Sequence, residues 1–424
     1  MVSYCSRKGN IVIDRDIFER VVRRIDSYRD EMIQLQIDLT AIPALSPDSG
    51  GDGEFKKSRF IIDYLTKHGF TDIREFNAPD ERVTAGVRPN VVTTLPGGNP
   101  DKTVWLLSHM DIVPPGEPGL WHSDPYKGYV KDGKIFGRGM EDNQQDLVSS
   151  IFAARALMDE GVTPASTVGL VFVADEETGS TMGLGHLIEN HATLFSQTDL
   201  IIVPDFGNTD GSVIEIAEKS ILWLRLVTKG TQCHASRPAL GKNAFVAASH
   251  FVVKLGELRD LFDATDPIYR PPESTFEPTK KETNIPNINT IPGEDVFYLD
   301  CRILPQYELA DVISAIRTLA NEIERQFGVT IDVTPVQQVQ APAPTPADAD
   351  VVQALRDAVK EIYDVTAEPI GIGGGTVAAC FREKGFPVAV WSRLCEMAHQ
   401  PNEYCLIDNM IGNAKVFAHL FLQQ

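Results

Sequence analysis

The sequence predicts an α/β fold. Its first domain has a mostly parallel central sheet flanked by helices and is interrupted by an inserted ferredoxin-like α+β domain. Three observations predict this. Continuously apolar runs typical of buried parallel strands alternate with helical patterns in both terminal parts of the chain. The middle of the chain instead has the order strand, helix, strand, strand, helix, strand, which is the ferredoxin-like order. A length of 424 residues corresponds to two or three domains.

The terminal parts carry the alternation of strands and helices. Apolar spacings of three and four residues predict helical structure through Leu39, and a second helix is expected over 54–67. Buried strands are expected at 103–107, 168–174, 200–203 and 386–391, and helices at 143–160 and 351–363.

The middle of the chain is expected to form the inserted domain. Its predicted elements are a strand at 221–227, a helix at 244–262, strands near Ile288 and at 296–303, a helix at 309–327 and a strand at 329–333. The segment 266–283, rich in Pro, Glu and Lys, is predicted to be a long exposed loop, and the Pro-rich segment 341–346 a return linker. The predicted boundaries are 1–217 and 336–424 for the first domain and 218–335 for the inserted one.

Composition argues against several classes of protein. Hydrophobic residues make up 43% of the chain, which is enough to bury a core and excludes global disorder. The net charge of −20 argues against nucleic acid or an anionic membrane as a partner. No apolar run has the length of a transmembrane helix, and no targeting segment is expected. Six scattered cysteines without a Cys-x-x-Cys pair predict reduced thiols and a cytoplasmic location.

Histidines and acidic residues stand where the predicted strands end or the next helix begins. In open α/β sheets, ligands bind at the carboxyl ends of the strands. We therefore expect these side chains to meet at one edge of the sheet. They are His109, Asp111, Asp142, Glu176, Glu177, Asp205 and His399.

Each of these residues has a structural alternative when it is taken singly. A histidine at a strand end is often structural, Asp142 stands at the N-cap position of a helix, and Asp175–Glu177 resembles a solvated acidic loop. Together, two histidines and three carboxylates suit Zn²⁺, with Co²⁺ or Mn²⁺ as substitutes. Two Zn²⁺ ions and a bridging hydroxide would balance three carboxylates, which suits a partly buried site.

The glycine-rich run Gly371–Gly375 raises the question of phosphate binding. It lacks the Lys-Ser/Thr of a P-loop and the spacing of a dinucleotide-binding motif. We therefore expect it to offer backbone N–H groups to a carboxylate instead of a nucleotide.

These motifs together resemble a known family. The sequence is similar to the di-zinc amidohydrolases and peptidases that include acetylornithine deacetylase, succinyl-diaminopimelate desuccinylase, aminoacylase and glutamate carboxypeptidase. The matching motifs appear in the family's order over about residues 105–405. They are His109–Pro114, Gly137–Gly139 with Asp142, Glu176–Gly179, Asp205, Gly230 with His234–Ser236, Asn289–Pro292, Asp300–Arg302, Gly374–Thr376, and His399 with Asn402–Tyr404.

The resemblance implies which ion each predicted ligand would bind. We call these ligands the metal set: His109, Asp142, Glu177, Asp205 and His399. His109 and Asp205 would bind one zinc ion, Glu177 and His399 would bind the other, and Asp142 would bridge them. This arrangement would hold a hydroxide between two cations that polarise the scissile carbonyl.

Further roles follow from the same resemblance. Asp111 would orient His109, and Glu176 would be the general base that carries a proton from the bridging water to the leaving amine. The inserted domain would be a lid and dimerisation domain, from which His234 stabilises the tetrahedral oxyanion of the partner subunit's site.

The resemblance also implies the substrate contacts. Asn289, Arg302 and the backbone of Gly374, Gly375 and Thr376 would hold the substrate's carboxylate, for which an arginine fork is well suited. The sequence departs from the family beside this pocket. Asn143–Gln145 replaces x-Lys-Gly, and Val377 stands where an Asp is usual. Because both departures lie beside the predicted pocket, they bear on which substrate the protein recognises.

The function expected from this set is hydrolysis of the amide bond of N-acyl amino acids by a cytoplasmic homodimer, as in acetylornithine deacetylase or succinyl-diaminopimelate desuccinylase. A dipeptidase or carboxypeptidase would use the same chemistry on a short peptide. A non-catalytic metal- or amino-acid-binding relative is a third alternative, and the intact Glu176 argues against it.

Overall fold

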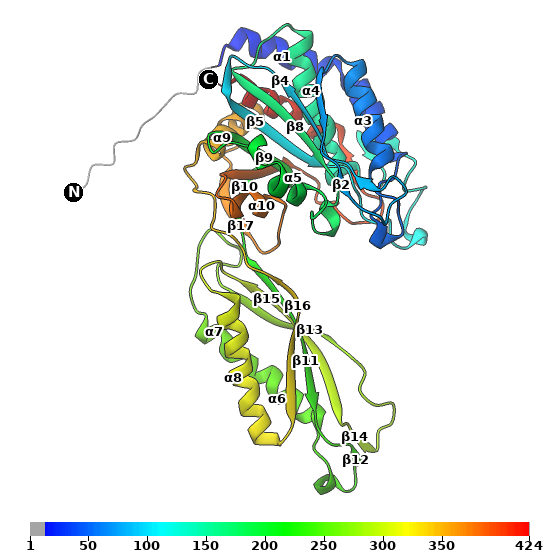
Figure 1. The fold of residues 1–424 in the computed structure, drawn as a ribbon, viewed down its shortest axis with the longest axis vertical. Helices are drawn as coiled ribbons and strands as arrows, with labels where there is room; N and C mark the ends of the chain where they lie inside the picture. Colours follow the sequence, from blue (N-terminus) through cyan, green and yellow to red (C-terminus); the bar gives the residue numbers. More distant parts are fainter. Residues whose placement is uncertain (1–12, 424) are drawn as a thin grey trace, which may run out of the picture. The chain divides into compact units, whose positions relative to one another are not determined.

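The structure is a computed structural model that describes residues 13–423 (Figure 1). The chain forms two compact units. The larger contains the described residues up to Ile216, Thr345–Pro369 and the segment from Cys380 onward, and the smaller contains Ala217–Pro344 and Ile370–Ala379.

An eight-stranded sheet forms the centre of the larger unit. Its strands, in spatial order, are β1 (Asp72–Glu75), β4 (Val91–Leu95), β8 (Ser166–Val173), β5 (Asn99–His109), β9 (Leu200–Asn208), β18 (Val388–Arg393), β10 (Val213–Glu218) and β17 (Glu368–Ile372). The four neighbours β8, β5, β9 and β18 pair in parallel. The pairs β1–β4, β4–β8 and β10–β18 are antiparallel. The sheet is therefore mixed with a parallel centre, and the α/β class is confirmed.

The parallel centre is apolar because helices cover it. Residues 104–107, 170–173 and 201–203 are all buried. Helices α4 and α11 contact these strands, and α4 is buried along most of its length. The helices of this unit are α1 (Arg15–Ser27), α2 (Arg29–Thr40), α3 (Phe55–Lys67), α4 (Gln145–Asp159), α5 (Leu184–Asn190), α9 (Asp350–Tyr363), α10 (Ala378–Glu383, its first residues in the smaller unit) and α11 (Ile407–Leu422).

Short strands complete the larger unit. They form a three-stranded sheet, in the order β19 (Tyr404–Leu406), β7 (Lys134–Phe136) and β6 (Tyr129–Lys131), and a pair of β2 (Ala78–Pro79) with β3 (Val87–Arg88). This small sheet matters for the site described below. The pairing of β19 with β7 brings together the segment that follows β7 and the segment that precedes β19.

The smaller unit has the expected order of elements. Its antiparallel sheet has the spatial order β13 (Thr275–Lys281), β15 (Glu294–Ile303), β11 (Ser220–Lys229) and β16 (Thr330–Val339). Helices α6 (Ala244–Lys254) and α8 (Leu309–Phe327) pack on it through Leu222, Leu224 and Leu226 of β11. Helix α7 (Leu258–Leu261) and the pair β12 (Cys233–His234) with β14 (Thr290–Ile291) complete the unit.

One strand of this unit differs from the prediction. The sequence predicts a loop over 266–283 and a strand near Ile288. The strand is instead β13, inside the supposed loop, and Ile288 is fully exposed in a connection. β13 lies at the edge of the sheet and buries Phe276 alone, so Pro278 and its lysines are tolerated.

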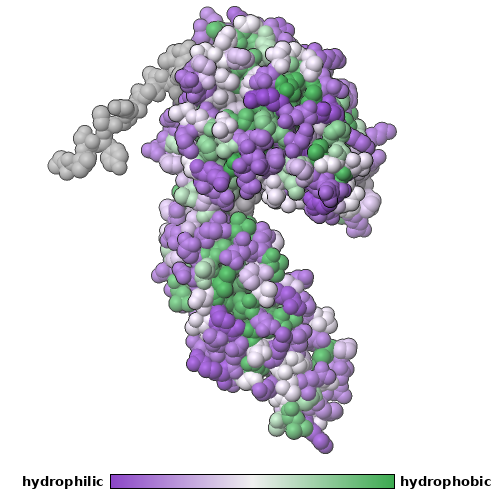
Figure 2. All heavy atoms as spheres, in the orientation of Figure 1, coloured by the Kyte–Doolittle hydropathy of each residue, from purple (hydrophilic) through white to green (hydrophobic). Residues whose placement is uncertain are grey.

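The surface agrees with the acidic, polar composition. Hydrophilic residues cover most of the visible surface of each unit, and a group of hydrophobic residues lies on the visible face of the smaller one (Figure 2). Among the described residues, no helix combines the length and apolar character needed to cross a membrane.

Candidate metal centre

The parallel centre of the sheet positions the predicted metal ligands. His109 is the last residue of β5, Glu176 and Glu177 follow β8, and Asp205 lies within β9. His399 follows β18, the next strand across the sheet. Because these four strands are parallel neighbours, their carboxyl ends lie along one edge of the sheet.

Asp142 lies between the two histidines. Its Oδ1 is 2.9 Å from Nε2 of His109, and its Oδ2 is 3.3 Å from Nε2 of His399. It lies in a short helical turn before α4, and its carboxylate does not cap that helix, whose N-cap is Gln144. The alternative of an N-cap aspartate is therefore wrong, and each oxygen of this carboxylate faces a different histidine.

Two groups of potential ligand atoms form around His109. The ligand atoms of His109, Asp142 and Glu177 lie within 4.8 Å of one another, and so do those of His109, Glu176 and Asp205. Nε2 of His109 is 3.5 Å from Asp205, and Nε2 of His399 is 3.1 Å from Glu177. All six side chains thus converge, as the sequence predicts.

Asp111 links His109 to the acidic loop after β8. Its two carboxylate oxygens accept hydrogen bonds from the backbone N–H groups of Glu176 and Glu177, at 3.1 and 3.0 Å. Nδ1 of His109 lies 3.0 Å from the backbone oxygen of Asp111 and 3.4 Å from its carboxylate. Asp111 therefore contacts the histidine mainly through its backbone and holds the glutamate loop through its side chain.

The charges in the set shift one another's pKa values. Burial lowers the pKa of His109, but Asp205 and two further aspartates raise it well above its usual value. Hydrogen bonds to Asp142 and Glu177 raise the pKa of His399 to about 10. Burial, followed by the charge of Asp205, raises the pKa of Glu176 well above its usual range. The carboxylates thus favour positive charge within the set, and Glu176 has the raised pKa of a proton carrier.

The donor set fits divalent cations. Oε1 of Glu177 is buried and accepts no hydrogen bond within the described residues, so one potential ligand oxygen is unpaired. Burying several carboxylates together is costly unless cations compensate them. Imidazole and carboxylate donors without thiolate match the preferences of Zn²⁺, Co²⁺ or Mn²⁺.

Asn143, which the sequence marks only as a departure from the family pattern, contributes to the site. Its Nδ2 donates to the backbone oxygen of Pro204 at 2.6 Å and to Oδ1 of Asp205 at 2.9 Å. It therefore orients Asp205 toward His109. The contact joins segments about 60 residues apart, so only the tertiary structure reveals it.

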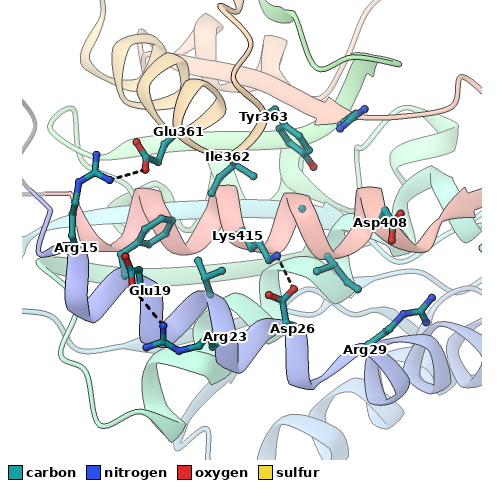
Figure 3. Close-up of a pocket in the computed structure, with 15 residues that line it drawn as sticks. Arg15, Glu19, Arg23, Asp26, Arg29, Glu361, Ile362, Tyr363, Asp408 and Lys415 are labelled. Carbon is teal, nitrogen blue, oxygen red and sulfur yellow. Dashed lines mark hydrogen bonds and ion pairs between the residues drawn. The ribbon is translucent and has the colours of Figure 1, made fainter.

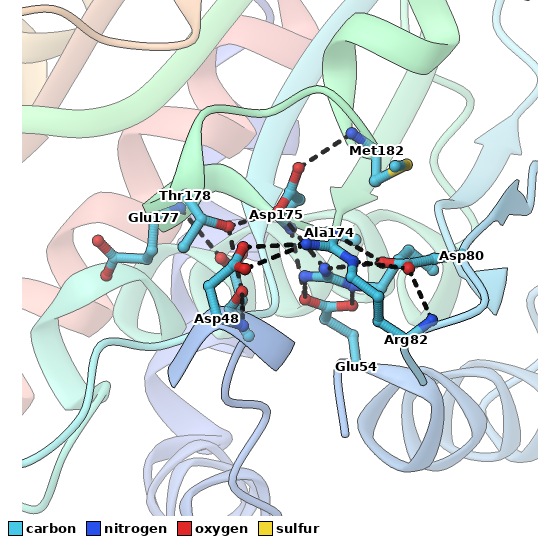
Figure 4. Close-up of polar contacts among 12 residues, drawn as sticks. Asp48, Glu54, Asp80, Arg82, Ala174, Asp175, Glu177, Thr178 and Met182 are labelled. Atoms are coloured by element: carbon cyan, nitrogen blue, oxygen red, sulfur yellow. Dashed lines mark hydrogen bonds and ion pairs between the residues drawn. The ribbon is translucent and has the colours of Figure 1, made fainter. Parts of the chain in front are cut away.

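A buried ion-pair network supports the glutamate loop. Arg88 forms a two-point ion pair with Glu54 and lies 3.5 Å from Asp175. Asp175 has a left-handed backbone (φ 64°) and accepts hydrogen bonds from Thr178 and Met182 (Figure 4). The network thus fixes the turn from which Glu176 and Glu177 project.

The predicted substrate residues form two groups in the smaller unit. His234 lies in β12 and Asn289 directly precedes β14, and the backbone N–H of Ala235 donates to the backbone oxygen of Asn289. His234 is exposed, and its Nδ1 accepts hydrogen bonds from Ser236.

The second group contains Arg302 and the glycine-rich loop after β17. Nη1 of Arg302 donates to the backbone oxygen of Gly373 at 2.8 Å, which puts it beside Gly374, Gly375 and Thr376. Nε and Nη2 donate to Asp300 at 2.7 and 3.1 Å. These hydrogen bonds use three of the five guanidinium N–H groups. Val377 is buried in the same loop.

A separate cavity of about 760 Å³ in the larger unit is lined mainly by residues of α1, α9 and α11, with Arg29 of α2 and Arg393 of β18 (Figure 3). Most of its charges are paired: Arg15 with Glu361, Arg23 with Glu19, and Lys415 with Asp26. No member of the metal set lines it, and we assign it no role.

Comparison with known proteins places the chain. It is 43% identical over 415 residues to an uncharacterized metallohydrolase of Methanococcus maripaludis, covering 92% of this chain and 98% of the relative. It is 26% identical to succinyl-diaminopimelate desuccinylase of Gluconacetobacter diazotrophicus over 91% of this chain and 95% of the relative. The structure of human carnosine dipeptidase 1 has the same fold, with a TM-score of 0.71 at 18% identity over 96% of this chain and 98% of the other. The model for peptidase family M20/M25/M40 matches residues 105–423. The chain therefore belongs to peptidase family M20/M25/M40, a family of metallohydrolases, which confirms the resemblance seen in its motifs.

Proposed function

We propose that this enzyme hydrolyses the amide bond of N-acyl amino acids with two bound Zn²⁺ ions, which Co²⁺ or Mn²⁺ can replace. The single observation that carries the proposal is the position of Asp142 between His109 and His399, with one carboxylate oxygen toward each. A carboxylate in that position is suited to bridge two cations. One cation would also be held by Asp205, and the other by Glu177.

Two bound cations would lower the pKa of a shared water and polarise the scissile carbonyl. Glu176 would take one proton from the attacking water and give it to the amide nitrogen. The water oxygen would bond to the carbonyl carbon as the C–N bond breaks, and passage of the second water proton to the amine would leave a carboxylate and an ammonium group. The raised pKa of Glu176 and its place in the ligand group of His109 and Asp205 support its role as the base.

The substrate contacts belong to the smaller unit. We assign the carboxylate of the substrate to Arg302, Asn289 and the backbone of Gly374, Gly375 and Thr376. The contact of Arg302 with Gly373 supports this grouping. We also propose that the enzyme is a cytoplasmic homodimer through the smaller unit, with His234 acting on the partner's site. The exposed position of His234 supports that role.

Amine release by the purified protein loaded with Zn²⁺ or Co²⁺ tests the proposal. The panel pairs N-acetyl- and N-succinyl-amino acids with dipeptides that have the same C-terminal residue. We expect turnover of acyl compounds. Preference for dipeptides would reassign the enzyme as a dipeptidase or carboxypeptidase with the same catalytic residues. Absence of turnover on both, with metal bound, would refute the deacylase.

A further inference from the structure

The loops that carry Asp142 and His399 lie outside the regular strands. Asp142 lies in a short turn after Gly139, and His399 lies in the segment between β18 and β19. Glu396, His399 and Asn402 all have left-handed backbones, with φ of 59°, 63° and 59°. Such conformations are unfavourable for residues other than glycine, so the surrounding contacts must hold this loop in place.

Glu403 holds the Asp142 loop. One of its carboxylate oxygens accepts hydrogen bonds from the backbone N–H groups of Glu141 and Asp142, at 2.9 and 3.1 Å. The other accepts from the backbone N–H of Gly139 at 2.9 Å and from Nη1 of Arg138 at 2.7 Å. Glu403 is fully buried. A carboxylate four residues after His399 thus binds the backbone of Asp142 itself.

Glu141 holds the His399 loop in the same way. Its two carboxylate oxygens accept hydrogen bonds from the backbone N–H groups of Cys395 and Met397, which precede His399 in its loop. Glu141 is also buried, and it is the direct neighbour of Asp142. Each loop therefore contributes one metal-set residue and one carboxylate that binds the backbone of the other loop.

We propose that Glu141 and Glu403 form a reciprocal clamp, two positioning residues that fix the spacing between Asp142 and His399. The clamp rests on the proposed function and deepens it, since that spacing would govern how Asp142 and His399 hold a cation together. Neither carboxylate is among the ligand groups around His109. The carboxylate oxygens of both residues accept hydrogen bonds from backbone N–H groups, and Glu403 also accepts from Arg138. Their effect on a cation is therefore indirect.

The clamp predicts an asymmetry between two conservative variants. A glutamine at either position must turn an NH₂ group toward N–H donors, because both carboxylate oxygens are acceptors. Glu141→Gln frees the His399 loop and leaves the bonds from Glu403 to the Asp142 backbone. Glu403→Gln frees Asp142, which belongs to both cation positions.

Titration of the full-length, metal-free protein with Co²⁺ tests this. We expect wild type to bind two ions, Glu141→Gln to lose at least about tenfold affinity for one of them, and Glu403→Gln to lose about that much for both. Asp199→Asn is the matched control. Asp199 is also buried and accepts from the N–H groups of Thr103, Ser196 and the Trp105 indole, at the opposite end of β9. The Asp199→Asn variant should bind Co²⁺ with the wild-type affinity.

Amide hydrogen exchange in the metal-free variants gives a second readout that does not depend on metal. Glu141→Gln should speed exchange in peptides covering 394–400, and Glu403→Gln in peptides covering 138–143. A general loss of protection across the larger unit, or unchanged exchange in both peptides, would overturn the clamp. Wild-type Co²⁺ affinity in both variants would overturn it as well. Wild type that binds no Co²⁺ would refute the proposed function, whereas the exchange experiment would still decide on the clamp.

Discussion

Asp142 shows how one side chain takes its role from its neighbours. Its pKa is lowered by hydrogen bonds to His109 and His399, although burial alone would raise it. A partly buried carboxylate kept ionised between two imidazoles is suited to bind cations. Glu176 lies in the same site but has a raised pKa, because burial and Asp205 both disfavour its charge. Two carboxylates in one site are thus suited to different tasks by their surroundings.

Replacing Glu176 by glutamine should separate binding from chemistry. The amide cannot accept the proton from water, so we expect kcat to fall by about 10²–10⁴-fold. Both metal ions should remain, because the proposed ligands are unchanged. Steady-state kinetics together with metal analysis measures the two effects, and wild-type turnover would refute Glu176 as the base.

Asn143→Ala should weaken the cation position at Asp205. Without the hydrogen bond from Nδ2, Asp205 loses its orienting partner, and we expect about 10–100-fold lower affinity for one ion. Titration with Co²⁺ measures it. Asn284→Ala is the matched control, since Asn284 also donates to an aspartate, Asp295, outside the metal set. Equal effects of the two variants would contradict the role of Asn143.

At the scale of elements, the turn after β8 depends on a buried ion pair from distant segments. Arg88, in β3, and Glu54, which precedes α3, are both fully buried and bound at two points. They lie next to Asp175, which begins the turn with Glu176 and Glu177. The position of this turn thus depends on contacts that span more than 80 residues.

Arg88→Met should destabilise the larger unit strongly. It leaves Glu54 buried without its partner, and we expect a loss of about 3–5 kcal/mol in the free energy of unfolding. Arg59→Met removes a partly exposed pair with Glu75 and should cost less than about 1 kcal/mol. Denaturant-induced unfolding measures both. Similar losses in the two variants would show that burial of the Arg88 pair is not decisive.

For the whole molecule, a buried histidine outside the metal set should make stability depend on pH. His419 lies in the last turn of α11 against Phe18, and burial lowers its pKa from 6.5 to about 4. The unfolded chain therefore binds a proton at a higher pH than the folded one. This histidine contributes stability above pH 6.5 that is lost as the pH falls toward 4.

His419→Gln should remove that part of the acid sensitivity. Relative to its own stability at neutral pH, the variant should lose less than wild type between pH 6.5 and 4, with a difference up to about 3 kcal/mol. Thermal unfolding at several pH values measures this. His122→Gln, at an exposed histidine of the same unit, is the control. Parallel pH curves for His419→Gln and wild type would contradict the prediction.

The proposed homodimer makes a prediction about mixed subunits. Protein carrying His234→Ala and protein carrying Glu176→Gln should each be inactive. In a mixed dimer, one site combines an intact Glu176 with an intact partner histidine. Random mixing should therefore restore about a quarter of wild-type activity. No recovery after confirmed subunit exchange would place His234 outside the partner's site.

The sequence by itself determined the α/β class, most of the order of elements and which residues are candidate metal ligands. Strand-end motifs and buried strands are local patterns, and the parallel centre of the sheet brings them together without further information. It did not locate β13, because an edge strand that buries only Phe276 has the composition of a loop.

Only the tertiary structure decided what surrounds the metal set. The contacts of Asn143 with Asp205, of Glu403 with Asp142, of Glu141 with the His399 loop and of Arg88 with Glu54 join segments that are distant in the chain. A buried polar group must find a partner, but sequence spacing does not say which one. Local periodicity therefore fixed the positions of the candidate ligands, and long-range packing fixed their orientation.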